Sequence, residues 1–161
     1  MLGELYERAL AGLERPGIER ADGRTTVLPV QRWPRAGVGP WRLTVALGER
    51  MPGTGRWDTV LLADGNVGIN CDPAALQRRA KSLLKPYSRV VTEIGPPGTP
   101  LRRELGRLRM RQGAGARFPW AWVGTDHIRA LADTAGLRVA EIWAGIGRWL
   151  AALSPQSAGH G

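Results

Sequence analysis

The clearest pattern of apolar and polar positions in the chain runs from 57 to 94. It opens with a strand expected at 57–63, in which the apolar run 60–63 lacks alternation and therefore predicts a strand covered on both faces. Asp72 and Pro73 then supply a side-chain cap and a first-turn proline for a helix. Its inward face would carry Leu76, Ala80, Leu83 and Leu84. With a second strand at 89–94, the order strand, helix, strand within 38 residues predicts a parallel crossover unit.

A second clear pattern lies toward the carboxyl end. Thr125 is expected to cap a helix that ends at Gly136. The apolar residues at helical spacing between them are Ile128, Leu131, Ala132 and Ala135. Two strands at 137–144 and 148–153 then predict a hairpin, and residues 154–161 are expected to form a loose polar tail.

The rest of the chain is less regular. Apolar positions at helical spacing predict a short helix within 2–13. We call the N-terminal segment 1–35, which contains this helix, the lead-in. Residues 25–30 predict an edge strand that tolerates a proline, and 42–47 predict a second, weaker strand. Residues 99–117 fit a helix and a strand equally well, so both stay open.

Length and composition are those of a globular protein. The 161 residues fit a single domain, at roughly 150 residues per domain, and 43% of them are hydrophobic. The single cysteine, Cys71, excludes an internal disulfide framework and a four-thiolate zinc site. The first eight residues include acids where a signal peptide needs a basic and then an apolar stretch. We therefore expect a cytoplasmic protein that does not span a membrane.

The net charge of +9 is concentrated in one region. Residues 71–117 contain 11 basic and 3 acidic side chains and thus carry a net +8. One interpretation is an anion-binding face formed by Arg102, Arg103, Arg107, Arg109 and Arg111. The other is a solvated arginine-rich stretch, which we favour because no aromatic residues alternate with these arginines. Nucleic acid is therefore not the partner we expect.

Several motifs together resemble a known family. They are Trp57-Asp-Thr-Val-Leu-Leu-Ala-Asp-Gly-Asn-Val-Gly-Ile69, Asp72-Pro73, Phe118-Pro-Trp-Ala121 and Gly147-Arg-Trp149. This set is similar to the carboxyl half of class I S-adenosylmethionine-dependent methyltransferases of a small bacterial kind, over residues 57–153. The resemblance implies a partial Rossmann-like α/β sheet in three layers. It also implies S-adenosylmethionine as cofactor and methyl transfer to a small-molecule acceptor.

The family binds its cofactor mainly through a glycine-rich turn that precedes the strand matching 57–63. Only 27 residues, 30–56, separate that strand from the lead-in, and they predict no helix. A full strand–helix–strand unit takes about 30 residues or more, so we expect the cofactor-binding half to be missing. The chain is then either a methyltransferase that binds its cofactor weakly or a catalytically inactive, partner-binding module of the same fold.

The best candidate site is the loop 64–72, because open α/β sheets bind ligands at the carboxyl ends of parallel strands. The resemblance implies that Asp64 and Asn66 bond an amine or orient a nucleophile, and that Gly65 and Tyr6 join them in binding the cofactor. The other interpretation is a tight turn stabilised by Asx side chains.

Two further features bear on this site. Trp120 and Trp122 lie on one face of a predicted extended segment, where they form either an aromatic wall for the acceptor or part of the core and interface packing, which we favour. Members of the resembled family tend to carry glycines where this chain has Asn70-Cys71 and Tyr87-Ser88.

The sheet of the resembled family has the strand order 3-2-1-4-5-7-6, and residues 57–63 correspond to its fourth strand. Loss of the first three strands would therefore leave 57–63 as an unpaired edge. That strand contains no lysine and no proline to discourage pairing. Either 42–47 folds back beside it or a second copy of the chain pairs with it as a dimer. We expect the internal strand and a monomer, because the short tether gives it the higher effective concentration. So short a connection requires antiparallel pairing.

Amide hydrogen exchange combined with light scattering tests this arrangement. We expect a monomer in which the amides of residues 43–47 are protected from exchange. A dimer that loses protection at residues 60–62 on dilution would contradict the internal strand.

Overall fold

The computed structural model describes residues 17–27, 53–63, 66–111, 113–145 and 147–157. The chain, which its length suggested to be one domain, divides into two compact units. We call residues 1–51 and 104–119 the hairpin unit, and residues 52–103 and 120–161 the crossover unit. The helix expected within 2–13 and the strand expected at 42–47 lie outside the described residues.

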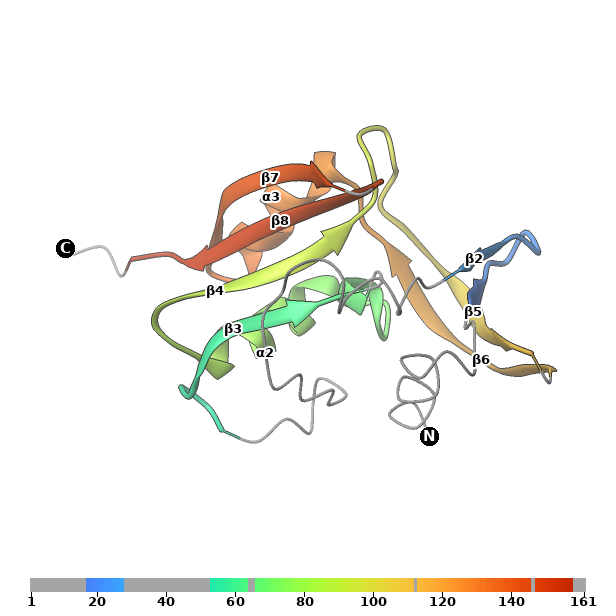
Figure 1. Ribbon diagram of the computed structural model, residues 1–161, viewed down its shortest axis with the longest axis horizontal. Coiled ribbons are helices and arrows are strands. Elements are labelled where there is room, and N and C mark those ends of the chain that lie inside the picture. The colour runs from blue at the N-terminus through green and yellow to red at the C-terminus, as the bar shows by residue number, and fades with distance from the viewer. Residues whose placement is uncertain (1–16, 28–52, 64–65, 112, 146, 158–161) are drawn as a thin grey trace. The chain divides into compact units, whose positions relative to one another are not determined.

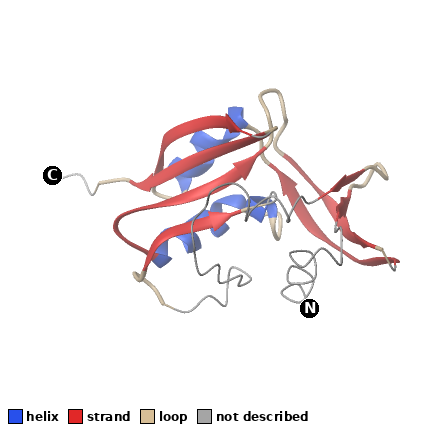
Figure 2. Cartoon of the chain, in the orientation of Figure 1, coloured by secondary structure: helices blue, strands red, loops and turns tan. Residues whose placement is uncertain are grey.

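The crossover unit contains a four-stranded sheet with two helices (Figures 1 and 2). In sheet order its strands are β3 (Trp57–Leu62), β4 (Leu84–Ile94), β8 (Arg148–Pro155) and β7 (Leu137–Gly145). β3 and β4 are parallel and are joined through helix α2 (Pro73–Leu83), which confirms the predicted crossover. β8 runs antiparallel to both β4 and β7, which confirms the carboxyl hairpin.

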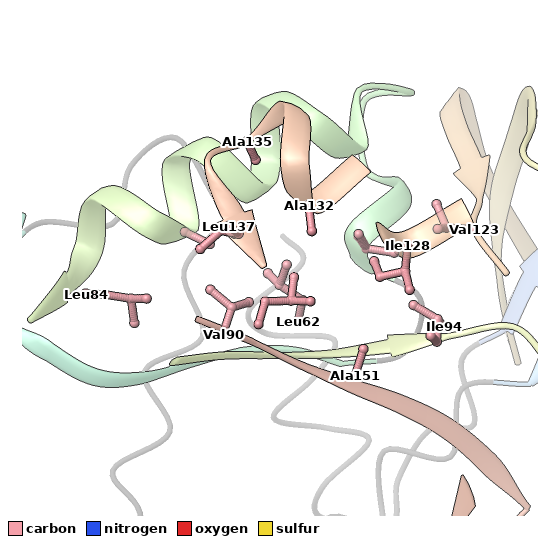
Figure 3. Close-up of a cluster of buried hydrophobic side chains, with 13 residues drawn as sticks. Leu62, Leu84, Val90, Ile94, Val123, Ile128, Ala132, Ala135, Leu137 and Ala151 are labelled. Carbon is pink, nitrogen blue, oxygen red and sulfur yellow. The ribbon is translucent and has the colours of Figure 1, made fainter. Parts of the chain in front are cut away.

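The core of this unit lies between the sheet and its helices (Figure 3). Helices α2 and α3 (Thr125–Thr134) pack on the same face of the sheet, where Ile128 and Val90 are fully buried. Burying one such side chain contributes about 1.5–3 kcal/mol. Within the described residues of this unit no helix covers the opposite face, so they form two of the three expected layers.

The two helices begin differently. Asp72 caps α2 as predicted, because its side chain accepts a hydrogen bond from the Ala75 amide at 2.9 Å and Pro73 follows it. The predicted cap of α3 was wrong by one residue, since Gly124 is the N-cap and Thr125 is already helical. The Thr125 hydroxyl donates to Oδ1 of Asp126 at 3.5 Å, and the Thr125 amide donates to the carbonyl of Gly95, the residue after β4, at 3.1 Å.

Two strand boundaries also differ from the prediction. β4 begins at Leu84 rather than at 89, and its pairing with β3 shifts register between Trp57 and Thr59. The tail expected from 154 starts later, because β8 continues to Pro155, which pairs with Leu137.

A second, antiparallel sheet contains four strands that lie mostly in the hairpin unit. In sheet order these are β2 (Thr25–Val27), β1 (Gly17–Glu19), β5 (Arg102–Met110) and β6 (Gly113–Trp122). The segment 99–117, for which helix and strand stayed open, is therefore mostly strand. Gly106 and the glycines at 113 and 115 disfavour a helix, and β1 supplies the partner that a strand needs.

Three residues other than glycine have positive φ angles in the described part of the chain. They are Asn70 (61°), Cys71 (58°) and Tyr87 (64°). These are positions at which the resembled family tends to carry glycine. A left-handed backbone costs a residue with a side chain roughly 1–2 kcal/mol, and asparagine adopts it more readily than cysteine or tyrosine.

Replacing Tyr87 by glycine should stabilise the protein. The Tyr87 side chain is fully exposed, so its loss removes no packing. Relief of backbone strain exceeds the extra entropy of glycine in the unfolded chain, and we expect a gain of about 0.5–1 kcal/mol in urea unfolding. As a control, Arg89→Gly removes an exposed side chain from the same strand at a position without positive φ, and should lower stability. Equal losses of stability in the two variants would contradict the claim that the backbone is strained at Tyr87.

Candidate functional site

The carboxyl ends of β3 and β4 lie at the same edge of their sheet because the two strands are parallel. The short 3-10 helix η2 (Asn66–Gly68) follows β3, and Ile69 then forms a bridge with Trp120 at the end of β6. After β4, Gly95 forms a bridge with Gly124. Residues 120–124 therefore run alongside both loops, and the candidate site is this edge.

A close backbone approach fixes the first loop. A Cβ atom built on Gly68 would lie 1.7 Å from the Ala121 carbonyl oxygen, so only glycine fits. Next to it, Val67 is 1% exposed and belongs to the hydrophobic core. Two features therefore fix the loop after β3: the close backbone contact of Gly68 with Ala121 and the burial of the Val67 side chain in the core.

Cys71 connects the first loop to two other segments. Its Sγ donates to the Trp120 carbonyl at 3.0 Å, and its own carbonyl accepts from Nε of Arg103 at 2.9 Å. A thiol that donates to a backbone carbonyl is a weak structural contact. The arrangement favours a structural thiol at Cys71 over a nucleophile.

The second loop is held by a carboxylate of α3. The Gly98 amide donates to Oδ2 of Asp126 at 2.7 Å, and the Gly95 amide donates to the Val123 carbonyl at 2.7 Å. Asp126 lies in the first turn of its helix, where a negative charge is favourable. Asp72 and Asp126, which flank this edge, therefore both accept backbone N–H groups.

The sequence-predicted site residues fall partly outside the described chain. Tyr6, Asp64 and Gly65 are not described, and of Asn66 only the backbone is, as the first residue of η2. Trp120 is 3% exposed, with its ring centroid 6.2 Å from that of the half-buried Trp122. Burial of Trp120 is what the packing interpretation predicts, and only Trp122 offers surface to an acceptor.

Two residues of this edge were missed from the sequence. Gly68 was recognised only as one glycine of a turn, because its contact with Ala121 joins positions 53 residues apart. Arg103 was placed among five arginines with no way to single it out. Its bond to Cys71 depends on the path of β5, which the sequence did not establish.

Within the arginine-rich stretch 102–111, for which we favoured a solvated stretch over an anion-binding face, two arginines pair with an acidic side chain of the protein. Nε and Nη2 of Arg107 donate to Oε1 of buried Glu19 at 2.9 and 2.6 Å, and Arg109 forms an ion pair with the same carboxylate. The hydrogen bond from Arg107 holds the pKa of Glu19 below its ordinary value. A depressed carboxylate pKa stabilises the fold above the unfolded pKa and ceases to do so in acid. These pairings support a structural role for Arg107 and Arg109.

Two other kinds of site were searched for. The described residues contain no group of three or more histidine, cysteine or acidic side chains that could hold a metal ion. None of the helices in the described ranges is both long and apolar enough to cross a membrane.

The close approach at Gly68 leads to a direct test. Gly68→Ala should lower the free energy of unfolding by about 3 kcal/mol or more, because backbone must move to admit the methyl group. Gly145→Ala is a matched control in the same unit, since the nearest atom to its added Cβ is 3.9 Å away. Urea unfolding of the two variants measures the difference, and similar stabilities would contradict the tight contact.

Comparisons with known proteins support the fold of this chain. No protein-family model matches the sequence, and no curated protein matches it. Among solved structures, the chain is similar to an S-adenosylmethionine-dependent methyltransferase from Bacteroides fragilis in complex with S-adenosyl-L-homocysteine (20% identity, TM-score 0.50). That match covers 67% of this chain and 51% of the other.

A second solved structure gives the same picture. It is the 1,6-didemethyltoxoflavin-N1-methyltransferase of Burkholderia thailandensis, at 14% identity and a TM-score of 0.50, over 67% of this chain and 48% of that one. The present chain thus spans about half the length of these neighbours. At such identities the similarity establishes the fold alone: the chain has an α/β fold shared with part of Rossmann-like methyltransferases.

Proposed function

We propose that this protein acts in S-adenosylmethionine-dependent methyl transfer to a small acceptor, and that its crossover unit forms the acceptor side of the site. The observation that supports the proposal most is the sheet order β3-β4-β8-β7, with β3 and β4 parallel and the last hairpin antiparallel. It brings the loops after β3 and β4 together at the edge where open α/β sheets bind ligands.

The described residues do not by themselves fit the whole cofactor. Ribose hydroxyls are commonly bound by an acidic side chain at the end of a strand. At this edge Asp72 and Asp126 already accept backbone amides, and Glu93, near the end of β4, pairs with Arg148. By the resemblance, cofactor contacts fall to Asp64, Gly65, Asn66 and Tyr6, whose side chains are not described. We therefore derive no catalytic step through the cofactor and assign the described residues to the acceptor.

The contribution of the described residues is orientation. Direct methyl transfer needs the acceptor held in line with the donor, and rigid positioning can supply much of the rate. The contact of Gly68 with Ala121 and the bond from Cys71 to Trp120 hold the first loop against β6. Trp122 is the last residue of β6 and is half-buried. We propose that its exposed aromatic surface contacts the acceptor.

A second candidate is a non-catalytic module that binds a partner protein. The face of the sheet opposite the helices carries the cross-strand row Leu61, Val91 and Ala152, and no described helix of the unit covers it. Under either function we place the protein in the cytoplasm, because its single cysteine, Cys71, excludes the internal disulfide framework common in secreted proteins.

Titration of the ¹⁵N-labelled protein with S-adenosylhomocysteine tests the proposal. We expect amide shifts confined to residues 66–72 and 95–98, with a dissociation constant weaker than about 10 μM, because the sequence predicts no glycine-rich turn of the kind that lets backbone approach the cofactor. Asp64→Ala should remove these shifts while changing stability by less than about 1 kcal/mol. Asp58→Ala, an exposed acid near the start of β3, is the matched control and should keep them.

The outcomes separate the two candidates. An absence of shifts at about 1 mM ligand would reject the methyltransferase function and favour the module. Ligand binding that survives Asp64→Ala, together with strong destabilisation of that variant, would mean that Asp64 serves only a structural turn. Low-micromolar affinity would show that residues outside those described complete a full cofactor pocket.

A further inference from the structure

Arg103 occupies an unusual position at the candidate site. It is the second residue of β5, its side chain is exposed, and its Nε donates to the Cys71 carbonyl at 2.9 Å. Cys71 ends the loop that follows β3. The single hydrogen bond therefore places a guanidinium group at the carboxyl edge of the parallel strands, where the acceptor is proposed to bind.

This bond leaves most of the guanidinium available. Only Nε is engaged, and no other partner of Arg103 is found in the part of the chain that the structure describes. The nearest acid along the loop, Asp72, uses its side chain to cap α2. Arg103 thus differs from Arg107 and Arg109, whose charge is balanced by Glu19.

A guanidinium fixed at Nε has a defined chemical preference. Its two Nη groups form a planar edge whose N–H groups match both oxygens of a carboxylate. Anchoring by Cys71 sets the plane of this edge in advance, which lowers the entropy lost on binding. One guanidinium balances one carboxylate, whereas a phosphate dianion would need a second free cation.

We infer that Arg103 binds a carboxylate of the methyl acceptor, so that the acceptor is a small carboxylic acid. This inference rests on the proposed function and adds the class of acceptor to it. Arg103 is a specificity-determining residue in this account. The competing explanation is that Arg103 only ties the start of β5 to the loop after β3.

The test uses the full chain and three small probes. Benzoate carries the carboxylate, benzamide is its neutral counterpart of similar shape, and inorganic phosphate is the alternative anion. The arginine Nε–Hε signals and the amides of residues 69–72 are followed by NMR during titration. We expect benzoate, and not benzamide, to shift the Arg103 signal and these amides, with phosphate binding more weakly than benzoate.

Variants then assign the effect to this side chain. Arg103→Gln should weaken benzoate binding at least about fivefold, the size expected from one exposed charge-assisted contact. Arg103→Lys keeps the charge but lacks the planar edge, and should recover only part of the affinity. Arg89→Gln removes the same charge from an exposed position on β4 and should leave binding unchanged.

Each contrary result overturns the inference in its own way. Equal shifts with benzoate and benzamide would show that charge is not recognised. Tighter binding of phosphate would reject the carboxylate. Unchanged benzoate affinity in Arg103→Gln, with altered amides at residues 69–72 in the absence of probe, would establish the purely structural tie. S-adenosylhomocysteine binding is measured separately, so failure of the carboxylate site and failure of the methyltransferase function remain distinguishable.

Discussion

The parallel pairing of β3 with β4 is the constraint on which the candidate site depends. Parallel neighbours cannot be joined by a tight turn, so the chain must cross over the sheet, and α2 provides that crossing. The apolar side of α2 joins the core that α3 completes on the same face. Both strands consequently end at one edge, and the loops after them meet the segment 120–124 there.

The free-energy cost of a side chain differs between positions of the loop after β3. At Gly68 a side chain would collide with the Ala121 backbone, a cost that flexible atoms cannot absorb. At Asn70 and Cys71 the backbone is left-handed, but the cost of a side chain is about 1–2 kcal/mol each and can be tolerated. The loop therefore keeps its path although two of its residues are not glycine. That path places the Cys71 carbonyl where Arg103 reaches it.

Sequence patterns predicted the elements that rely on local signals. The crossover of 57–94 was visible because an apolar strand, the Asp72 cap and Pro73 all occur in order. The β7–β8 hairpin was visible because two apolar runs flank a glycine turn. Segment 99–117 was not resolved, since strand β5 depends on pairing with β1, about 90 residues away along the chain.

Contacts between distant positions account for what remained hidden at the site. Arg107 and Glu19 are 88 residues apart in sequence, so the engagement of the basic face could not be seen. Helix α3 starts one residue earlier than predicted, and the amide of Thr125 donates to Gly95, 30 residues earlier in the chain. The choice of the loop after β3 as the candidate site followed from a general property of parallel sheets, whereas Arg103 followed only from three-dimensional contacts.

The central claim is that the loops after β3 and β4 both lie against the end of β6 and so form one edge. Nuclear Overhauser contacts between backbone protons test it most directly, with the Val60–Val90 pair of the parallel strands as internal reference. The account predicts contacts between Ile69 and Trp120 and between Gly95 and Gly124 in the same spectrum. Their absence, with the Val60–Val90 contact present, would contradict the proposed site.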